Sequence, residues 1–215
     1  MKLRHTFLTA TAAIAVTLGA SLNAQAAVYI TEWMYSGTDG EFVEFTNTGV
    51  LPVDLTGWSY SDSAQIPGHV DLSAFGILAG GQSVILTEAV EAAFRTAWNL
   101  DPAVKVIGEN IVNLGRGDEI NLYDASNALV DRLTYADNGA AGGPRTQNVS
   151  GETTPDNYGK NDATKWTLSV NGVNGAVTST GADVGSPGTA PIPEPSAPLF
   201  AMGALALLGI RRRKA

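Results

Sequence analysis

The sequence predicts an all-β domain, a β-sandwich with one short helical insertion, and three observations lead to this prediction. Short runs rich in Val, Ile, Phe, Tyr and Thr alternate apolar and polar residues with a period of two, as half-buried strands do. Gly, Asn, Asp and Ser separate these runs at short intervals, as turns require. Between residues 27 and 192, only one stretch has the alanine-rich composition of a helix. Short strands at such spacing favour a sandwich, although a barrel would show the same alternation.

The elements follow in order along the chain. The expected strands are residues 28–33, 41–46, 53–62, 82–87, 104–107, 119–123, 129–135 and 164–170. The helix is expected over residues 88–98, with Thr87 placed to cap it. Residues 136–163 are rich in Gly, Asn and Thr, which is typical of a long surface loop. The domain therefore spans residues 27–170, and the Gly/Ser/Thr/Pro-rich residues 171–192 are expected to form a linker.

The N-terminal residues have the pattern of a targeting segment. Lys2 and Arg4 precede an apolar run, residues 7–22, and Ala24 and Ala26 match the small-x-small cleavage pattern. This combination predicts a secretory signal peptide over residues 1–26, cut after Ala26. The threonines within the run and the early cleavage pattern disfavour an N-terminal membrane helix.

The last residues, 193–215, have three parts. They begin with Pro193-Glu194-Pro195, continue with an apolar run over residues 197–210, and end with Arg211, Arg212, Arg213 and Lys214. A helix over the apolar run would be about 21 Å long. This is short of the roughly 30 Å of a bilayer's hydrocarbon core, so the run makes a weak membrane helix whose cationic end stays in the cytoplasm. The two prolines keep the preceding segment extended.

This tripartite tail resembles the PEP-CTERM sorting signal. The resemblance implies that a membrane enzyme of the exosortase type cuts the chain near Pro193-Glu194-Pro195, and it links the protein to cells that make exopolysaccharide. The alternative is an ordinary C-terminal membrane anchor, which would share the apolar run and the basic end.

Charge and composition limit the classes of function. Without the signal peptide and the tail, 7 basic and 20 acidic residues remain, a net charge of about −13. Such a surface is a poor partner for nucleic acid, and it would repel an anionic polysaccharide unless a divalent cation bridged the two. The chain has no cysteine, and His69 is the one histidine left after signal cleavage. Thiol catalysis, disulfides and histidine-rich zinc sites are thereby excluded.

Six segments in order resemble the lamin tail domain. They are residues 30–32, 40–47, 53–62, 78–86, 114–124 and 130–135, and residues 185–188 resemble the closing turn of that family. The resemblance covers about 28–136 and implies an immunoglobulin-like sandwich that serves as an accessory module of secreted proteins. It implies no reaction, and no enzyme domain accompanies it here.

Three acidic residues are candidate calcium ligands. Asp118, Glu119 and Asp124 lie beside two expected turns and could supply carboxylate oxygens to the ion. The alternative is that these side chains bond only to their own turns. Glu41 and Glu44 are three residues apart on a strand and point to opposite faces, so they cannot act as an acid/base pair. Glu44 is expected to be a structural acid bonded to a nearby turn.

Aromatic and nucleophilic residues give two more candidates. Trp98, at the end of the helical insertion, is the tryptophan best placed for exposure and for contact with a sugar ring, whereas Trp58 is expected in the core. His69 with Ser73 could suggest nucleophilic catalysis, but the chain has no Gly-x-Ser-x-Gly elbow.

The sequence thus predicts an exported, non-catalytic structural or adhesion module that acts at the cell surface or in the extracellular matrix. Its expected partners are an exosortase-type enzyme and exopolysaccharide, and no resident cofactor is required. Two alternatives remain: a calcium-dependent glycan-binding module, and a small secreted hydrolase with an atypical carboxylate site.

Overall fold

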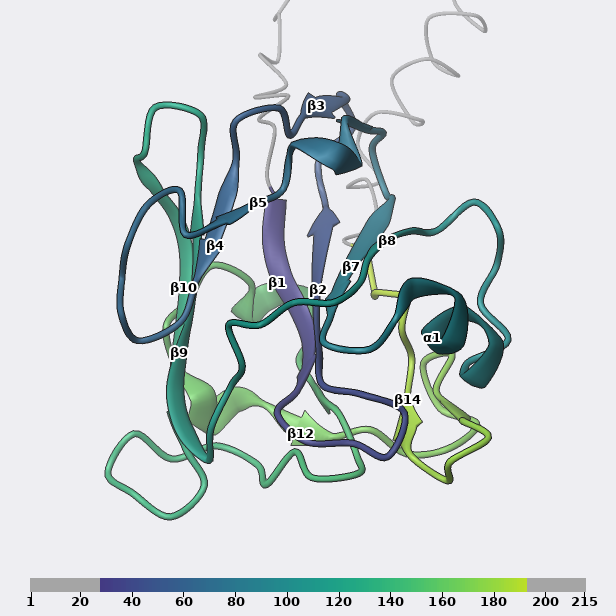
Figure 1. Cartoon of the computed structure of the whole chain (residues 1–215). Helices are drawn as coiled ribbons and strands as arrows, with labels where there is room; N and C mark the ends of the chain where they lie inside the picture. The colour runs from purple at the N-terminus through teal and green to yellow at the C-terminus, as the bar shows by residue number, and fades with distance from the viewer. Residues whose placement is uncertain (1–27, 193–215) are drawn as a thin grey trace, which may run out of the picture.

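The computed structural model describes residues 28–192, which form a mostly β structure with one α-helix (Figure 1). The six-stranded sheet has the order β12 (Thr167–Leu168), β11 (Gly151–Glu152), β1 (Val28–Met34), β2 (Phe42–Asn47), β7 (Ser83–Thr87) and β8 (Lys105–Ile107). The four-stranded sheet has the order β10 (Leu129–Ala136), β9 (Gly117–Tyr123), β4 (Ser59–Ser61) and β5 (Val70–Asp71). Both sheets are antiparallel except for the β7–β8 pair.

The remaining elements are short. Two small ladders pair β3 (Val53–Asp54) with β6 (Ile77–Leu78) and β13 (Val177–Thr178) with β14 (Val184–Gly185). The helix is α1 (Glu91–Ala97), and single 3₁₀ turns occur at Ser73–Phe75, Pro155–Asn157 and Ala163–Lys165.

The main core lies between the two sheets. The predicted alternation of faces is confirmed on β2, where Val43 and Phe45 face this core, and on β9, where Ile120 and Leu122 face it from the other side. The expectation that the β2 segment is half-buried is wrong, because both of its faces are covered. Asp131 on β10 joins the sheets directly, because its Oδ2 accepts the N–H of Ile30 at 2.9 Å. The arrangement is consistent with the expected immunoglobulin-like sandwich.

A second core covers the opposite face of the six-stranded sheet, on which α1 lies (Figure 1). Phe42 from β2 and Phe94 from α1 meet edge to face, with ring centroids 5.5 Å apart. Trp98, which follows α1, packs on both rings. The helical insertion therefore forms a third layer, held by aromatic contacts.

Three of the expected elements differ from the structure in kind or by several residues. The helix begins at Glu91, after Val90, and Thr87 does not cap it, because the Thr87 hydroxyl donates to the Glu41 carbonyl at 2.6 Å. Residues 53–62 form two short strands, since Gly57 has a φ of 78° and turns the chain between them. The run 164–170 is a 3₁₀ turn followed by β12.

The loop and linker expected from composition pack on the sandwich. Residues 136–163 contain β11, which pairs with β1. Residues 171–192 contain β13 and β14, and Asp183 and Ser186 are buried there. This differs from the expected linker because bonds from distant parts of the chain, rather than local propensity, hold the segment in place.

The proposed signal peptide 1–26, with Ala24 and Ala26, and the proposed sorting tail 193–215 lie outside the described residues. Between residues 28 and 192, no helix has the length and apolar character needed to cross a bilayer.

Candidate functional site

Two neighbouring strands bring a pair of glutamates together beneath the C-terminal segment. Glu32 on β1 lies directly opposite Glu44 on β2 in the antiparallel register, so both side chains share one face of the sheet. A β-bulge between Ile30 and Glu32 shifts the strand locally and places Thr31 on the same face. Glu32 is 1% exposed and Glu44 is fully buried. The arrangement is a buried acid pair.

Each glutamate accepts a hydrogen bond from the closing turn of the chain. The Ser186 N–H donates to Glu32 Oε1 at 2.6 Å, and the Gly188 N–H donates to Glu44 Oε2 at 2.6 Å. The Ser150 hydroxyl also donates to Glu32 Oε1. These contacts confirm the structural role predicted for Glu44, although the turn that donates to it lies 144 residues further along the chain.

A chain of hydroxyl groups extends the acid pair across the sheet. Glu44 Oε1 accepts from Thr31 Oγ1 at 2.6 Å and from Thr46 Oγ1 at 3.1 Å. The Thr46 hydroxyl is also 2.7 Å from the Ser83 hydroxyl on β7. Because every one of these groups is buried, the strip is polar but closed to solvent.

Burial controls the protonation of the pair. Loss of solvent raises the pKa of Glu32 to about 8, and the neighbouring Glu44 carboxylate adds to the rise, while the Ser150 and Ser186 bonds oppose it. Burial likewise raises the pKa of Glu44, against its bonds to Thr31 and Gly188. A third glutamate, Glu152, lies opposite Glu32 on β11, and one oxygen each of Glu32 and Glu152 has no hydrogen-bond partner.

Glu41 is a separate buried acid directly before β2. Its Oε2 accepts the N–H of Leu114 at 2.8 Å. Burial raises the pKa of Glu41 to about 9, and the nearby carboxylates of Glu88 and Asp118 contribute to the rise. The carboxyl group fixes the 108–116 connection to β2.

The three candidate calcium ligands do not converge. Asp118 and Asp124 lie at opposite ends of β9, about 20 Å apart at the rise of an extended strand. Asp124 Oδ1 accepts from Ser126 and Ala128 within its own hairpin loop. Across residues 28–192, no group of three His, Cys, Asp or Glu side chains has the arrangement of a metal site.

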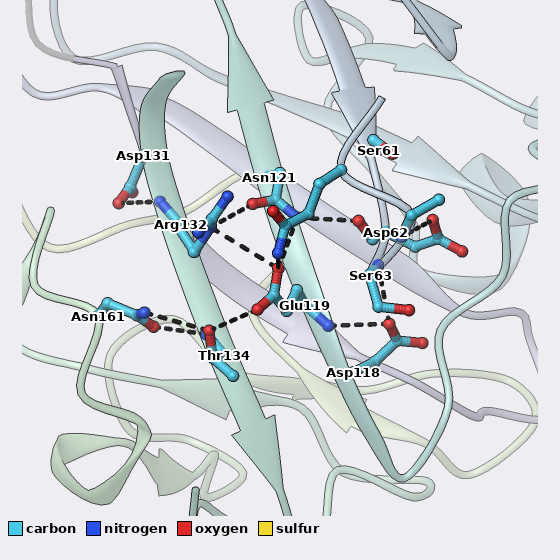
Figure 2. Close-up of polar contacts among 12 residues, drawn as sticks. Ser61, Asp62, Ser63, Asp118, Glu119, Asn121, Asp131, Arg132, Thr134 and Asn161 are labelled. Atoms are coloured by element: carbon cyan, nitrogen blue, oxygen red, sulfur yellow. Dashed lines mark hydrogen bonds and ion pairs between the residues drawn. The ribbon is translucent and has the colours of Figure 1, made fainter. Parts of the chain in front are cut away.

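Asp118 and Glu119 belong instead to a polar network on the outer face of the four-stranded sheet, which Figure 2 shows. Arg132 Nε donates to Asn121 Oδ1 at 2.5 Å and lies 3.7 Å from Glu119 Oε2. The Asn121 amide donates to the Asp62 carbonyl at 2.9 Å, which holds the 62–69 loop over the sheet. The polar groups of this face therefore bond mainly to one another.

The other candidates are also part of the framework. His69 Nδ1 is 3.4 Å from the Ser61 hydroxyl, whereas the Ser73 hydroxyl donates to Asp71 Oδ1 at 2.5 Å, so no His69–Ser73 pair forms. Trp98 is 4% exposed and packed in the second core, which corrects the expectation that its ring is free for a sugar. Trp58, expected in the core, is half-buried against it.

Sequence reasoning missed Glu32 and the pairing of the two acids. The available signal was an acid at position 32 in a strand of mainly apolar residues, but period-two alternation predicts that such a residue faces the solvent. Only the third layer, formed by α1 and the C-terminal segment, makes that face internal.

Comparison with known proteins agrees with the fold. The model of the Lamin Tail Domain family matches residues 22–137, which include both members of the acid pair. No curated protein matches the chain. Residues 138–192, which supply β11 and the closing turn on the acid pair, lie beyond the matched region. With more than half of its length matched by that model, the chain belongs to the lamin tail domain family.

Proposed function

We propose that the protein is an exported, non-catalytic structural or adhesion module that a membrane enzyme processes at its C-terminus. In this account the chain carries a signal peptide over residues 1–26 and a PEP-CTERM sorting tail over residues 193–215. An exosortase-type enzyme cuts near Pro193-Glu194-Pro195, and the lamin tail domain then acts at the cell surface or in the matrix beside exopolysaccharide.

The observation that carries this proposal is the position of the tail relative to the folded domain. The Tyr158 hydroxyl donates to the Pro191 carbonyl at 3.0 Å, so the folded domain extends to within two residues of Pro193. The Pro-Glu-Pro sequence, the apolar run and the basic end follow directly along the sequence. Such an arrangement suits a tail whose only task is delivery.

The state of the polar side chains supports a non-catalytic role. Glu32, Glu41 and Glu44 are buried and accept backbone N–H groups. Asp71 and Asp124 are bonded to their own turns. General acid/base catalysis needs a titratable group within reach of a substrate. The alternative hypothesis, a small secreted hydrolase with an atypical carboxylate site, gains no support from these five acids.

Intact mass of the native protein in membrane and extracellular fractions of its host tests the proposal. A product that lacks residues 1–26 and the tail from about Pro193, found outside the inner membrane, is the expected result. A variant without Arg211, Arg212, Arg213 and Lys214 should lose its orientation signal and accumulate unprocessed. A wild-type mass that retains these four residues in the membrane fraction would make the tail a plain anchor and contradict the proposal.

A further inference from the structure

The last described residues form a strap across the outer face of the six-stranded sheet. We define the strap as residues 184–192, which begin with β14 and end next to Pro193. Its start is fixed to the chain near β11, because Val184 donates to the Asn148 carbonyl at 2.9 Å and accepts from the Ser150 N–H at 2.8 Å. The strap is therefore part of the third layer.

The middle of the strap is closely fitted. Gly185, Ser186 and Pro187 are buried, and a Cβ built at Gly185 would lie 3.0 Å from Glu32 Oε1 and 3.2 Å from the Trp98 ring. Gly188 has a φ of 88°, and a Cβ there would lie 2.7 Å from Val104. Together with the bonds to Glu32 and Glu44, this fit clasps the strap onto the acid pair.

The end of the strap is held by fewer contacts. The Thr189 N–H donates to the Ser186 carbonyl at 2.9 Å, and the Tyr158 hydroxyl donates to the Pro191 carbonyl at 3.0 Å. Thr189 and Ile192 are exposed. The strap is thus buried at residues 185–187 and held by few contacts over residues 189–192, next to Pro193.

A protease or transpeptidase binds its substrate as an extended segment with residues on both sides of the cut. A cut near Pro193 requires residues 189–192 to enter the enzyme, and in the structure the Pro191 carbonyl is bonded to Tyr158 of the domain. When a protein opens and closes faster than it is cut, the cleavage rate follows the population of the open form.

We propose that the strap is an autoinhibitory latch on C-terminal processing. The closed strap withholds residues 189–192 from the processing enzyme, and cleavage occurs from the state in which the bond between Tyr158 and Pro191 is broken. The latch rests on the proposed function, since it concerns the enzyme that cuts near Pro193. It assigns Tyr158 and the strap a role in timing the release of the domain.

The substitution Tyr158→Phe tests the latch with the smallest change. It removes the hydroxyl bond to Pro191 and keeps the ring, which stacks on Tyr29 with centroids 6.2 Å apart. The loss of one hydrogen bond should raise the open population, and with it the processing rate, roughly 2- to 10-fold. Tyr35→Phe is the matched control, because it removes a hydroxyl bond to Asp137, remote from the strap in the sequence.

Two readouts on the full-length chain separate the possible failures. Hydrogen exchange of the Thr189 amide in the purified protein reports strap opening without any processing enzyme. Pulse-chase mass analysis in the host reports the rate of processing. Faster exchange and faster processing in Tyr158→Phe, with both unchanged in Tyr35→Phe, is the expected result.

Other outcomes overturn the latch. If Tyr158→Phe speeds exchange at Thr189 but is processed at the wild-type rate, strap opening does not limit the cut. If exchange at Thr189 is unchanged, the bond to Pro191 does not hold the strap. If the wild-type protein is never processed in its host, the proposed function fails, and the latch fails with it.

Discussion

Glu32 and Glu44 face each other across β1 and β2, and both accept N–H groups from the same turn of the C-terminal strap. Two carboxylates in this position would be like charges, and no ion pair between residues 28 and 192 includes either of them. Protonation removes the repulsion, which is why burial and proximity together raise the pKa of Glu32. The stability of the third layer is therefore linked to pH.

The free energy of unfolding should fall as the pH rises from about 4.5 to about 9. Folding raises the pKa of Glu32 from 4.5 to about 8, of Glu41 from 4.5 to about 9, and of Asp131 from 3.8 to about 6. Over this window the folded protein holds protons that the unfolded chain has released, so each rise of one pH unit lowers the free energy of unfolding. Urea denaturation at pH 5, 7 and 9 measures the slope. A stability that rises with pH over the same range would contradict this linkage.

Glu32→Gln should flatten this dependence. The amide keeps an oxygen that can accept from Ser186 but cannot ionise, so the contribution of Glu32 between about pH 4.5 and pH 8 disappears. Asp54→Asn is the matched control: Asp54 is exposed, and its bonds to Thr56 lower its pKa, so it contributes only in acid. Denaturation curves of both variants at pH 5 and pH 8 give the comparison. Equal slopes for Glu32→Gln and the wild type would show that Glu32 does not titrate in this range.

Gly188→Ala should destabilise the protein more than Gly68→Ala does. Both glycines have positive φ angles, 88° and 81°, so both substitutions force an L-residue into the left-handed region at a cost of about 1 kcal/mol. A Cβ at Gly188 also meets Val104 at 2.7 Å, whereas one at Gly68 meets nothing within 4 Å. The overpacking should add about 1–3 kcal/mol, measurable by chemical denaturation. If both variants lose the same free energy of unfolding, the strap moves to accommodate the added Cβ at no measurable cost.

Trp98→Ala should act through stability. The ring packs on Phe42 and Phe94 in the second core, so its loss should cost about 3–5 kcal/mol, while Trp98→Phe should cost less. Trp58→Ala, at a half-buried position, is the comparison and should cost less than Trp98→Ala. Thermal and chemical denaturation provide the measurement. If Trp98→Ala keeps wild-type stability and loses affinity for a glycan, Trp98 is a ligand contact after all.

The sequence predicted the features that depend on neighbouring residues. Period-two alternation of apolar and polar residues predicted the positions of β2 and β10. Asp124 bonds within its own turn, as the alternative to a calcium site predicted. The positions of these groups follow from spacing alone.

What the sequence did not predict depends on contacts between distant residues. The composition of residues 171–192 is that of a linker, yet Ser186 and Gly188 are held by glutamates far away in the sequence. The same layer buries Trp98, and the sequence of the helical segment alone does not predict this burial. Burial of Glu32 follows from that covering and from nothing in its own strand.

The hydrogen bonds between the acid pair and the strap also affect the order in which the chain can fold. Glu32 and Ser186 are 154 residues apart, and Glu44 and Gly188 are 144 residues apart. Contacts of such separation are slow to form and reward folding only after a long loop has closed. A chain that emerges N-terminus first leaves both glutamates without their backbone donors until residue 188 has appeared. The third layer is thus the last part of the domain to become complete. It can close only when all residues of the domain have been synthesised.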